Sequence, residues 1–234
     1  MTGLSIGVIL GLVIALVIVL SMLQRRKREA FIRESPLPGD LLDALAITFP
    51  ALALKDRQLV ARGLRKFFLA QVKAGRNAVA MPSRSVGELW RLFANQRVAY
   101  GRYCEQAFGR LLPQTPPSAL TAHPGSEGAE RNAALRRCWW HACREETINP
   151  RKPTRLPLLF ALDSKLKIDG GFYYFTDDFT RKRKAARRDD NGGGWTFEHD
   201  RSWTAEDFQD TSLDGTTDGF GSDGGGDGGG DGGG

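Results

Sequence analysis

The side chains best suited to metal chemistry are three cysteines and one histidine: Cys104, Cys138, His141 and Cys143. Thiolate and imidazole are the usual ligands of zinc, and structural zinc sites pair cysteines that have two to four residues between them. Cys138 and Cys143, with four residues between them, are at the long end of that spacing, Cys104 has no such neighbour, and each of the three lies on a helically spaced run of apolar residues. A thiol in such a run behaves as a small hydrophobic group. We therefore interpret the cysteines as core residues and expect neither a metal nor another cofactor.

The two remaining histidines lack a plausible catalytic partner. His123 lies in a connection rich in Pro and Gly, and His199 lies near the C-terminus. The sequence shows no recognisable Ser, His and Asp grouping and no glycine loop of the kind that binds phosphate. An odd number of cysteines without the spacing of a secreted scaffold agrees with a reducing compartment. The sequence favours binding over catalysis, although it leaves an enzyme open.

The elements that would position any site begin with an apolar stretch, residues 4–23, that contains no charge. Twenty helical residues span roughly 30 Å, which is the thickness of the hydrocarbon core of a bilayer. Arg25, Arg26, Lys27 and Arg28 follow at once, and such residues stay in the cytoplasm. The pattern predicts an uncleaved signal-anchor that crosses the cell inner membrane once, with the N-terminus outside and these four cations at the lipid headgroups.

Two alternatives exist for this stretch. A cleaved signal peptide has a cationic start, a shorter apolar run and a small-residue cleavage site, and none of these is evident. The helix of a soluble protein would need an unusually large core around it.

Small residues recur at every fourth position of the predicted span. Gly3, Gly7, Gly11 and Ala15 would lie along one helix face, where small side chains let a second helix approach closely. This face predicts a homo-oligomer that forms through the transmembrane helix. The alternative is that glycine is simply frequent in membrane helices.

The rest of the chain is predicted to contain a hinge over 29–39 and one helical cytoplasmic domain over 40–176, after an anchor over 1–28. Apolar residues recur with helical spacing in four segments, 59–68, 86–93, 100–111 and 135–143. Gly75 and Pro113 are placed to end two of these helices, and Ser85 with Glu88 predicts a capping box. Gly170 and Gly171 precede a short aromatic-rich extended segment. The predicted fold is thus mostly α.

The segment 177–234 is basic and then acidic. Its basic patch consists of Arg181, Lys182, Arg183, Lys184, Arg187 and Arg188. This patch could bind anionic lipid, pair with the acidic residues, or bind nucleic acid. Residues 189–234 carry 12 acids and one Arg and would compete with phosphate, so we do not expect nucleic acid as the main partner. The tail rich in Gly and Asp is predicted to be disordered, because it can bury little apolar surface.

The middle of the chain resembles the glycine-rich domain-containing proteins, in particular bacterial membrane-anchored relatives of the plant proteins. The motif residues that carry this resemblance most clearly are Pro82, Ser83, Trp90, Tyr103, Cys104, Phe108 and Gly109. The resemblance extends to Trp139-Trp140, to residues 155–163 and to Gly170-Gly171-Phe172. We interpret the seven motif residues as structural.

The chain departs from the family pattern at two places where relatives carry histidine. Arg91 follows Trp90, and Leu112-Pro113-Gln114 occupy the later place. The resemblance therefore implies that any metal or acid–base role of those histidines is missing here. The sequence predicts a non-catalytic, membrane-anchored cytoplasmic interaction module that binds the bilayer, an unknown protein and a second copy of itself. The alternatives are a degenerate or regulatory member of a metal-dependent enzyme family and a membrane-tethered nucleic-acid-binding protein.

Overall fold

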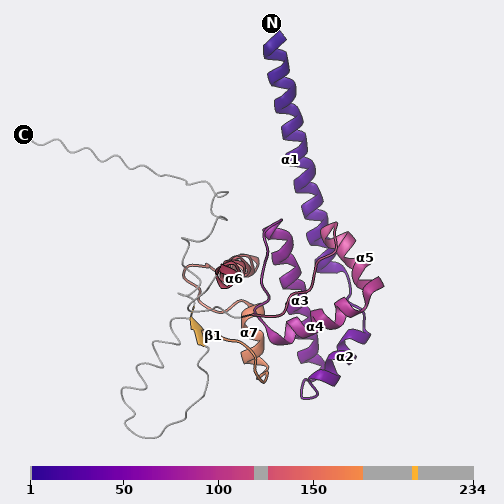
Figure 1. Cartoon of the computed structure of the whole chain (residues 1–234), viewed down its shortest axis with the longest axis vertical. Helices are drawn as coiled ribbons and strands as arrows, with labels where there is room; N and C mark the ends of the chain where they lie inside the picture. The colour runs from indigo at the N-terminus through magenta and orange to yellow at the C-terminus, as the bar shows by residue number, and fades with distance from the viewer. Residues whose placement is uncertain (1, 119–125, 176–201, 205–234) are drawn as a thin grey trace, which may run out of the picture.

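The first helix, α1 (Thr2–Glu34), projects from the rest of the molecule and then continues into it without a break (Figure 1). The computed structural model describes residues 2–118, 126–175 and 202–204. The stretch Gly7–Glu34 is long and apolar enough to cross a membrane, and its most apolar part is not buried against the domain. By length and composition, α1 is a single membrane span or a signal sequence.

Six further helices form the domain in the described part of the chain, so the predicted mostly helical fold is confirmed. They are α2 (Asp40–Thr48), α3 (Leu54–Ala74), α4 (Arg84–Asn95), α5 (Arg97–Phe108), α6 (Ser126–Glu145) and α7 (Leu158–Lys165). The strand β1 (Tyr173–Phe175) occupies the predicted aromatic segment and pairs in parallel with β2 (Ser202–Thr204). The strand β2 lies within the tail that we expected to be disordered. The basic patch lies outside the described residues.

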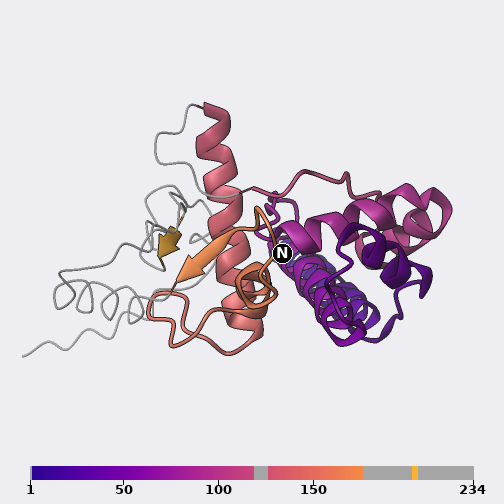
Figure 2. The same cartoon turned by 90° about the horizontal axis from the view of Figure 1, so that it is seen from below.

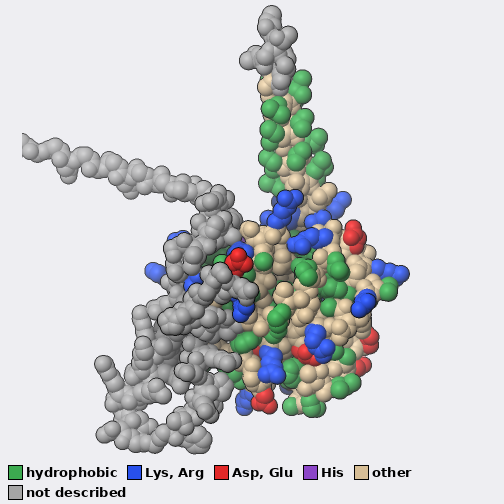
Figure 3. Space-filling view, in the orientation of Figure 1, with side chains coloured by type: hydrophobic (Ala, Val, Ile, Leu, Met, Phe, Trp, Pro, Cys, Tyr) green, Lys and Arg blue, Asp and Glu red, His purple; other side chains and the backbone are tan. Residues whose placement is uncertain are grey.

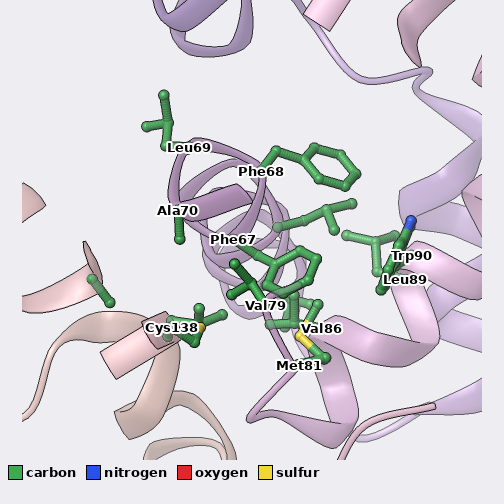
Figure 4. Close-up of a cluster of buried hydrophobic side chains, with 14 of the residues drawn as sticks. Phe67, Phe68, Leu69, Ala70, Val79, Met81, Val86, Leu89, Trp90 and Cys138 are labelled. Carbon is green, nitrogen blue, oxygen red and sulfur yellow. The ribbon is translucent and has the colours of Figure 1, made fainter. Parts of the chain in front are cut away.

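The central helix is α3, which contacts α1, α2, α4, α6 and α7. Its apolar stripe is buried, and the rings of Phe67 and Trp90 of α4 lie 5.0 Å apart. In Figure 4, Phe67 and Phe68 point from α3 toward α4, while Cys138 of α6 lies on another side of α3. Figure 2 shows α6, α7 and β1 together on one side of this central helix, with α1, α2, α4 and α5 on the other.

The helix ends follow the local sequence, but three differ from the prediction. The hinge is shorter than the expected 29–39, because α1 remains helical to Glu34. The residue that caps α4 is Ser83, whose hydroxyl accepts a hydrogen bond from the backbone N–H of Val86 at 3.3 Å, so the expected capping box at Ser85 is wrong. Leu111 is exposed and not part of a helical stripe, because α5 ends at Phe108 and Gly109 takes a left-handed conformation.

Candidate functional site

The C-terminal end of α1 is built into the core of the domain. Ile32 is fully buried, and the ring of Phe31 lies 5.3 Å from that of Tyr103 on α5. The Arg33 guanidinium donates two hydrogen bonds to the carboxylate of Glu145 on α6, at 2.9 and 3.0 Å. Apolar packing and an ion pair, in which Nη2 of Arg33 reaches both carboxylate oxygens, thus fix the direction of α1 relative to the domain.

Two of the four cations that follow the apolar stretch also touch the domain. The Arg25 guanidinium donates to the backbone carbonyl of Lys73 at 2.9 Å, which places a cation at the carboxyl end of α3, where the helix dipole favours it. The Arg28 guanidinium lies against Gly109, where an added Cβ would come within 2.5 Å of Nη2. Gly109 also has a φ of 69°, so a larger residue there would meet both strain and a collision.

The other two cations, Arg26 and Lys27, are exposed. Figure 3 shows Lys and Arg side chains gathered where the apolar part of α1 leaves the domain. We call this surface the basic collar and define it as Arg25, Arg26, Lys27 and Arg28. The collar is the surface that the sequence assigns to lipid headgroups.

A network of charges lies beneath the collar, between α1, α3 and α6. The ammonium of Lys73 pairs with the carboxylate of Glu145, and the guanidinium of Arg33 pairs with the same carboxylate. Burial raises the pKa of Glu145, but the hydrogen bonds from Lys73 and Arg33 outweigh it and hold this pKa below its ordinary value. Desolvation, together with the nearby cations Arg25 and Lys73, lowers the pKa of His141 to about 4. His141 is therefore neutral at physiological pH.

A buried carboxylate, that of Asp163 on α7, joins α7 to the start of α4, which is distant in sequence, and to the turn before β1. It accepts hydrogen bonds from the hydroxyls of Ser83 and Ser85 at 2.7 and 2.8 Å. It also accepts from the backbone N–H groups of Arg84 at 2.6 Å, of Ser85 at 3.2 Å and of Phe172 at 3.1 Å. The carboxylate thus satisfies the free donors at the start of α4, where a negative charge is favourable.

The turn after α7 approaches Asp163 closely. A Cβ added at Gly171 would lie 2.8 Å from Cβ of Asp163 and 2.9 Å from the carbonyl oxygen of Ile168. Such contacts are too short, so position 171 requires glycine. The hydroxyl of Tyr174 on β1 donates to the carbonyl of Pro82 at 3.0 Å and completes the same junction.

The motif residues of α4 and α5 form the second junction, between these helices and α1. The indole N–H of Trp90 donates to the hydroxyl of Tyr100 at 2.8 Å, and that hydroxyl donates to the carbonyl of Leu112 at 2.6 Å. The ring of Phe108 lies 5.6 Å from that of Phe68 on α3. Cys104 is buried on the same face of α5 as Tyr103 and Phe108. The seven motif residues therefore lie at contacts between helices or at helix ends.

The cysteines occupy the apolar core. Cys104, Cys138 and Cys143 are buried free thiols, and burial raises the pKa of Cys143 to about 12. Burial also raises the pKa of Cys104 and of Cys138. Within the described residues, no group of three His, Cys, Asp or Glu side chains could hold a metal ion. His123 and His199 lie outside the described residues.

The small residues of the apolar stretch lie on the projecting part of α1. In the described part of the chain, the space beside Gly7 and Gly11 is open, and Ala15 is exposed. Gly3 belongs to the same helix. The structure therefore leaves room on this face for a second helix, although it holds a single chain.

The site as a whole was only partly visible in the sequence. The four cations and the seven motif residues were singled out, and the structure brings Arg28 together with Gly109. Sequence reasoning missed Asp163 as the acceptor that holds the start of α4. The available signal was an acidic residue directly after the apolar run Leu158-Leu159-Phe160-Ala161-Leu162.

Fold and site together define a small helical domain that is continuous with a single apolar helix. A family model described as UCP032817-like matches residues 27–194, and the chain belongs to that family. The match begins in the basic collar, just before the part of α1 that packs into the domain. No curated protein and no solved structure is significantly similar to this chain. The resemblance to the glycine-rich domain-containing proteins depends on the sequence alone and stays a prediction.

Proposed function

We propose that this chain is an uncleaved single-pass protein of the cell inner membrane, with its N-terminus outside. In this proposal the helical domain is a cytoplasmic interaction module and not an enzyme. The observation that carries it is the continuity of α1 from the apolar stretch into the domain core. A helix that is buried at Ile32 and ion-paired at Arg33 serves the domain as well as the membrane.

The continuity of α1 supports an anchor over a cleaved signal sequence. Cleavage just after the apolar stretch would fall inside a regular helix, because the first non-helical segment after it begins at Ser35. It would also leave Phe31 and Ile32 on a short helical segment, 24–34, at the new N-terminus. The exposed cations Arg26 and Lys27 support a cytoplasmic position for the domain, because flanking cations determine orientation.

A binding role is supported by how the domain uses its polar side chains. Asp163, Glu145 and Glu146 each join separate elements: Glu146, for example, accepts from the backbone N–H of Leu158 at 3.0 Å and pairs with Arg155 and Lys66. Groups that are occupied in this way hold the elements together, which makes the domain a rigid scaffold on which a partner can bind. The proposal places that partner on the cytoplasmic side of the membrane and specifies it no further.

The orientation can be tested with a reporter fused to the C-terminus of the full chain in a bacterial host. A green fluorescent protein fusion should fluoresce in the membrane fraction, and an alkaline phosphatase fusion should be inactive. The matched control lacks residues 4–23 and should fluoresce without remaining in the membrane fraction after a high-salt wash, which screens electrostatic contact with lipid. Active alkaline phosphatase with a dark fluorescent fusion would show that the domain lies on the other side.

A further inference from the structure

We propose that the domain itself docks on the anionic surface of the bilayer, through the carboxyl ends of α3 and α5 beside the basic collar. This inference rests on the proposed function, because it requires α1 to span the membrane. It goes further in assigning a lipid contact to parts of the domain that are distant in sequence from the apolar stretch.

The depth of these two helix ends follows from their contacts with α1. Arg25 binds the carbonyl of Lys73 at the end of α3, and Arg28 lies against Gly109 at the end of α5. A helix rises 1.5 Å per residue, so Arg28 lies roughly 8 Å beyond Leu23 along α1. The headgroup layer of each leaflet is roughly 5–8 Å thick. Both helix ends therefore lie at the depth of the headgroups or at its edge.

The described structure agrees with this placement. In Figure 1, the ends of α3 and α5 lie beside α1 at the end of the domain from which α1 projects. The fixed packing of Phe31 and Ile32 prevents the domain from moving independently of the membrane-spanning part of α1. Anchored through a helix that enters its core, the domain must present this end to the bilayer.

The side chains at this end suit an anionic membrane. Arg76 follows α3 and Arg110 follows α5, and both are exposed. Leu111, next to Arg110, is 64% exposed although it is a large apolar side chain. An exposed leucine beside a cation can contact the apolar edge of an anionic interface while the cation pairs with the headgroups. Glu105, one turn before Gly109, is the exposed acid on this part of α5, and Glu29 is ion-paired to Arg25 at 3.3 Å.

The occupant of this surface is lipid because the surface continues the basic collar. The collar already meets the headgroups if α1 spans the bilayer, and Arg76 and Arg110 extend it on two sides. Each additional cation close to an anionic leaflet strengthens attraction roughly fivefold, so the pair contributes roughly thirtyfold. A soluble partner would have to reach Leu111 past the membrane itself.

Lipid contact can be measured on the full chain in nanodiscs that contain spin-labelled lipid. A fluorescent dye is attached at Leu111→Cys, and Val98→Cys is the matched control, because Val98 is 69% exposed at the opposite end of α5. The native cysteines are buried, and the unchanged chain measures their background. A third position, Val13→Cys, reports whether α1 is in the membrane. Discs of phosphatidylcholine are compared with discs that also contain phosphatidylglycerol.

The proposal expects quenching at Val13 in both kinds of disc, quenching at Leu111 that is stronger with phosphatidylglycerol than without it, and quenching at Val98 in neither. If Val13 is quenched while Leu111 behaves like Val98, the domain does not dock, although the anchor stands. If Val13 is not quenched, α1 does not span the bilayer, and both proposals fail.

A charge reversal separates electrostatic docking from mere proximity. Arg76→Glu combined with Arg110→Glu should reduce quenching at the Leu111 label to the level seen without phosphatidylglycerol, whereas Lys55→Glu, an exposed cation at the other end of α3, should not. Quenching at Leu111 that the double reversal leaves unchanged, or that is equal without phosphatidylglycerol, would overturn the proposal.

Discussion

Replacing Asp163 tests the physical reason why the start of α4, α7 and the turn before β1 are held together. The buried carboxylate receives two hydroxyl donors and three backbone N–H donors. In Asp163→Asn the side chain keeps its size but loses its charge and turns one acceptor into a donor. In Asp163→Ala every one of these donors loses its acceptor.

The expected loss of stability follows from the donors that cannot find another partner. The hydroxyls of Ser83 and Ser85 lie 3.1 Å apart and can bond to each other. The three N–H groups have no such alternative, and an unsatisfied buried donor costs about 1–3 kcal/mol. We therefore expect a loss of about 2–3 kcal/mol in the free energy of unfolding for Asp163→Asn and at least about 4 kcal/mol for Asp163→Ala.

The assay is thermal unfolding of the full chain in detergent, followed by near-ultraviolet circular dichroism of the buried Trp90 and Trp139. For a domain of this size, 1 kcal/mol corresponds to about 2–4 °C in Tm. Asp163→Asn should therefore unfold about 4–12 °C lower than the unchanged chain. Asp169→Asn, an exposed carboxylate in the same turn, is the control and should stay within about 0.5 kcal/mol.

If Asp163→Ala does not fold, Ser85→Ala provides the milder test, because it removes one donor and should cost about 1 kcal/mol. The reasoning is refuted if Asp163→Asn is as stable as the Asp169→Asn control.

Two further predictions concern pH and the apolar helix. His141 has its pKa lowered to about 4 by burial and neighbouring cations, so the unfolded chain binds a proton below about pH 6.5 that the folded chain does not. The free energy of unfolding should therefore fall by about 1–2 kcal/mol between pH 7 and pH 5. Urea titrations should show a smaller fall for His141→Gln. An equal fall in both proteins would exclude His141 as its source. Replacing Gly7 and Gly11 together by Ile should reduce self-association in a membrane reporter assay, because the bulkier residues close the open face of α1. The control is Val8→Ile combined with Leu12→Ile. An unchanged signal in the glycine variant would rule out this face.

The sequence was sufficient to predict an element wherever its residue pattern is compatible with only one kind of structure. The uncharged stretch before Arg25 predicts the projecting part of α1, and the helical stripes predict α3, α4, α5 and α6, because a helix must bury its apolar face. Gly75 ends α3 as predicted, and its φ of 66° shows the conformation that favours glycine there.

The prediction was incomplete where the partner is distant in sequence. Ser85 has the spacing of a capping residue, yet its hydroxyl donates to Asp163, 78 residues away, and Ser83 is the cap. A local pattern cannot reveal this acceptor. The turn-rich residues 35–39 suggest a hinge that we expected to begin at 29, but Ile32 finds its apolar partners in the domain and α1 continues to Glu34.

The most direct test of the central claim is the intact mass of the chain recovered from membranes after an alkaline carbonate wash. An uncleaved anchor predicts that the washed membranes retain the chain and that its mass includes residues 4–23. A mature chain that begins beyond residue 23 and is released by the wash would contradict the account.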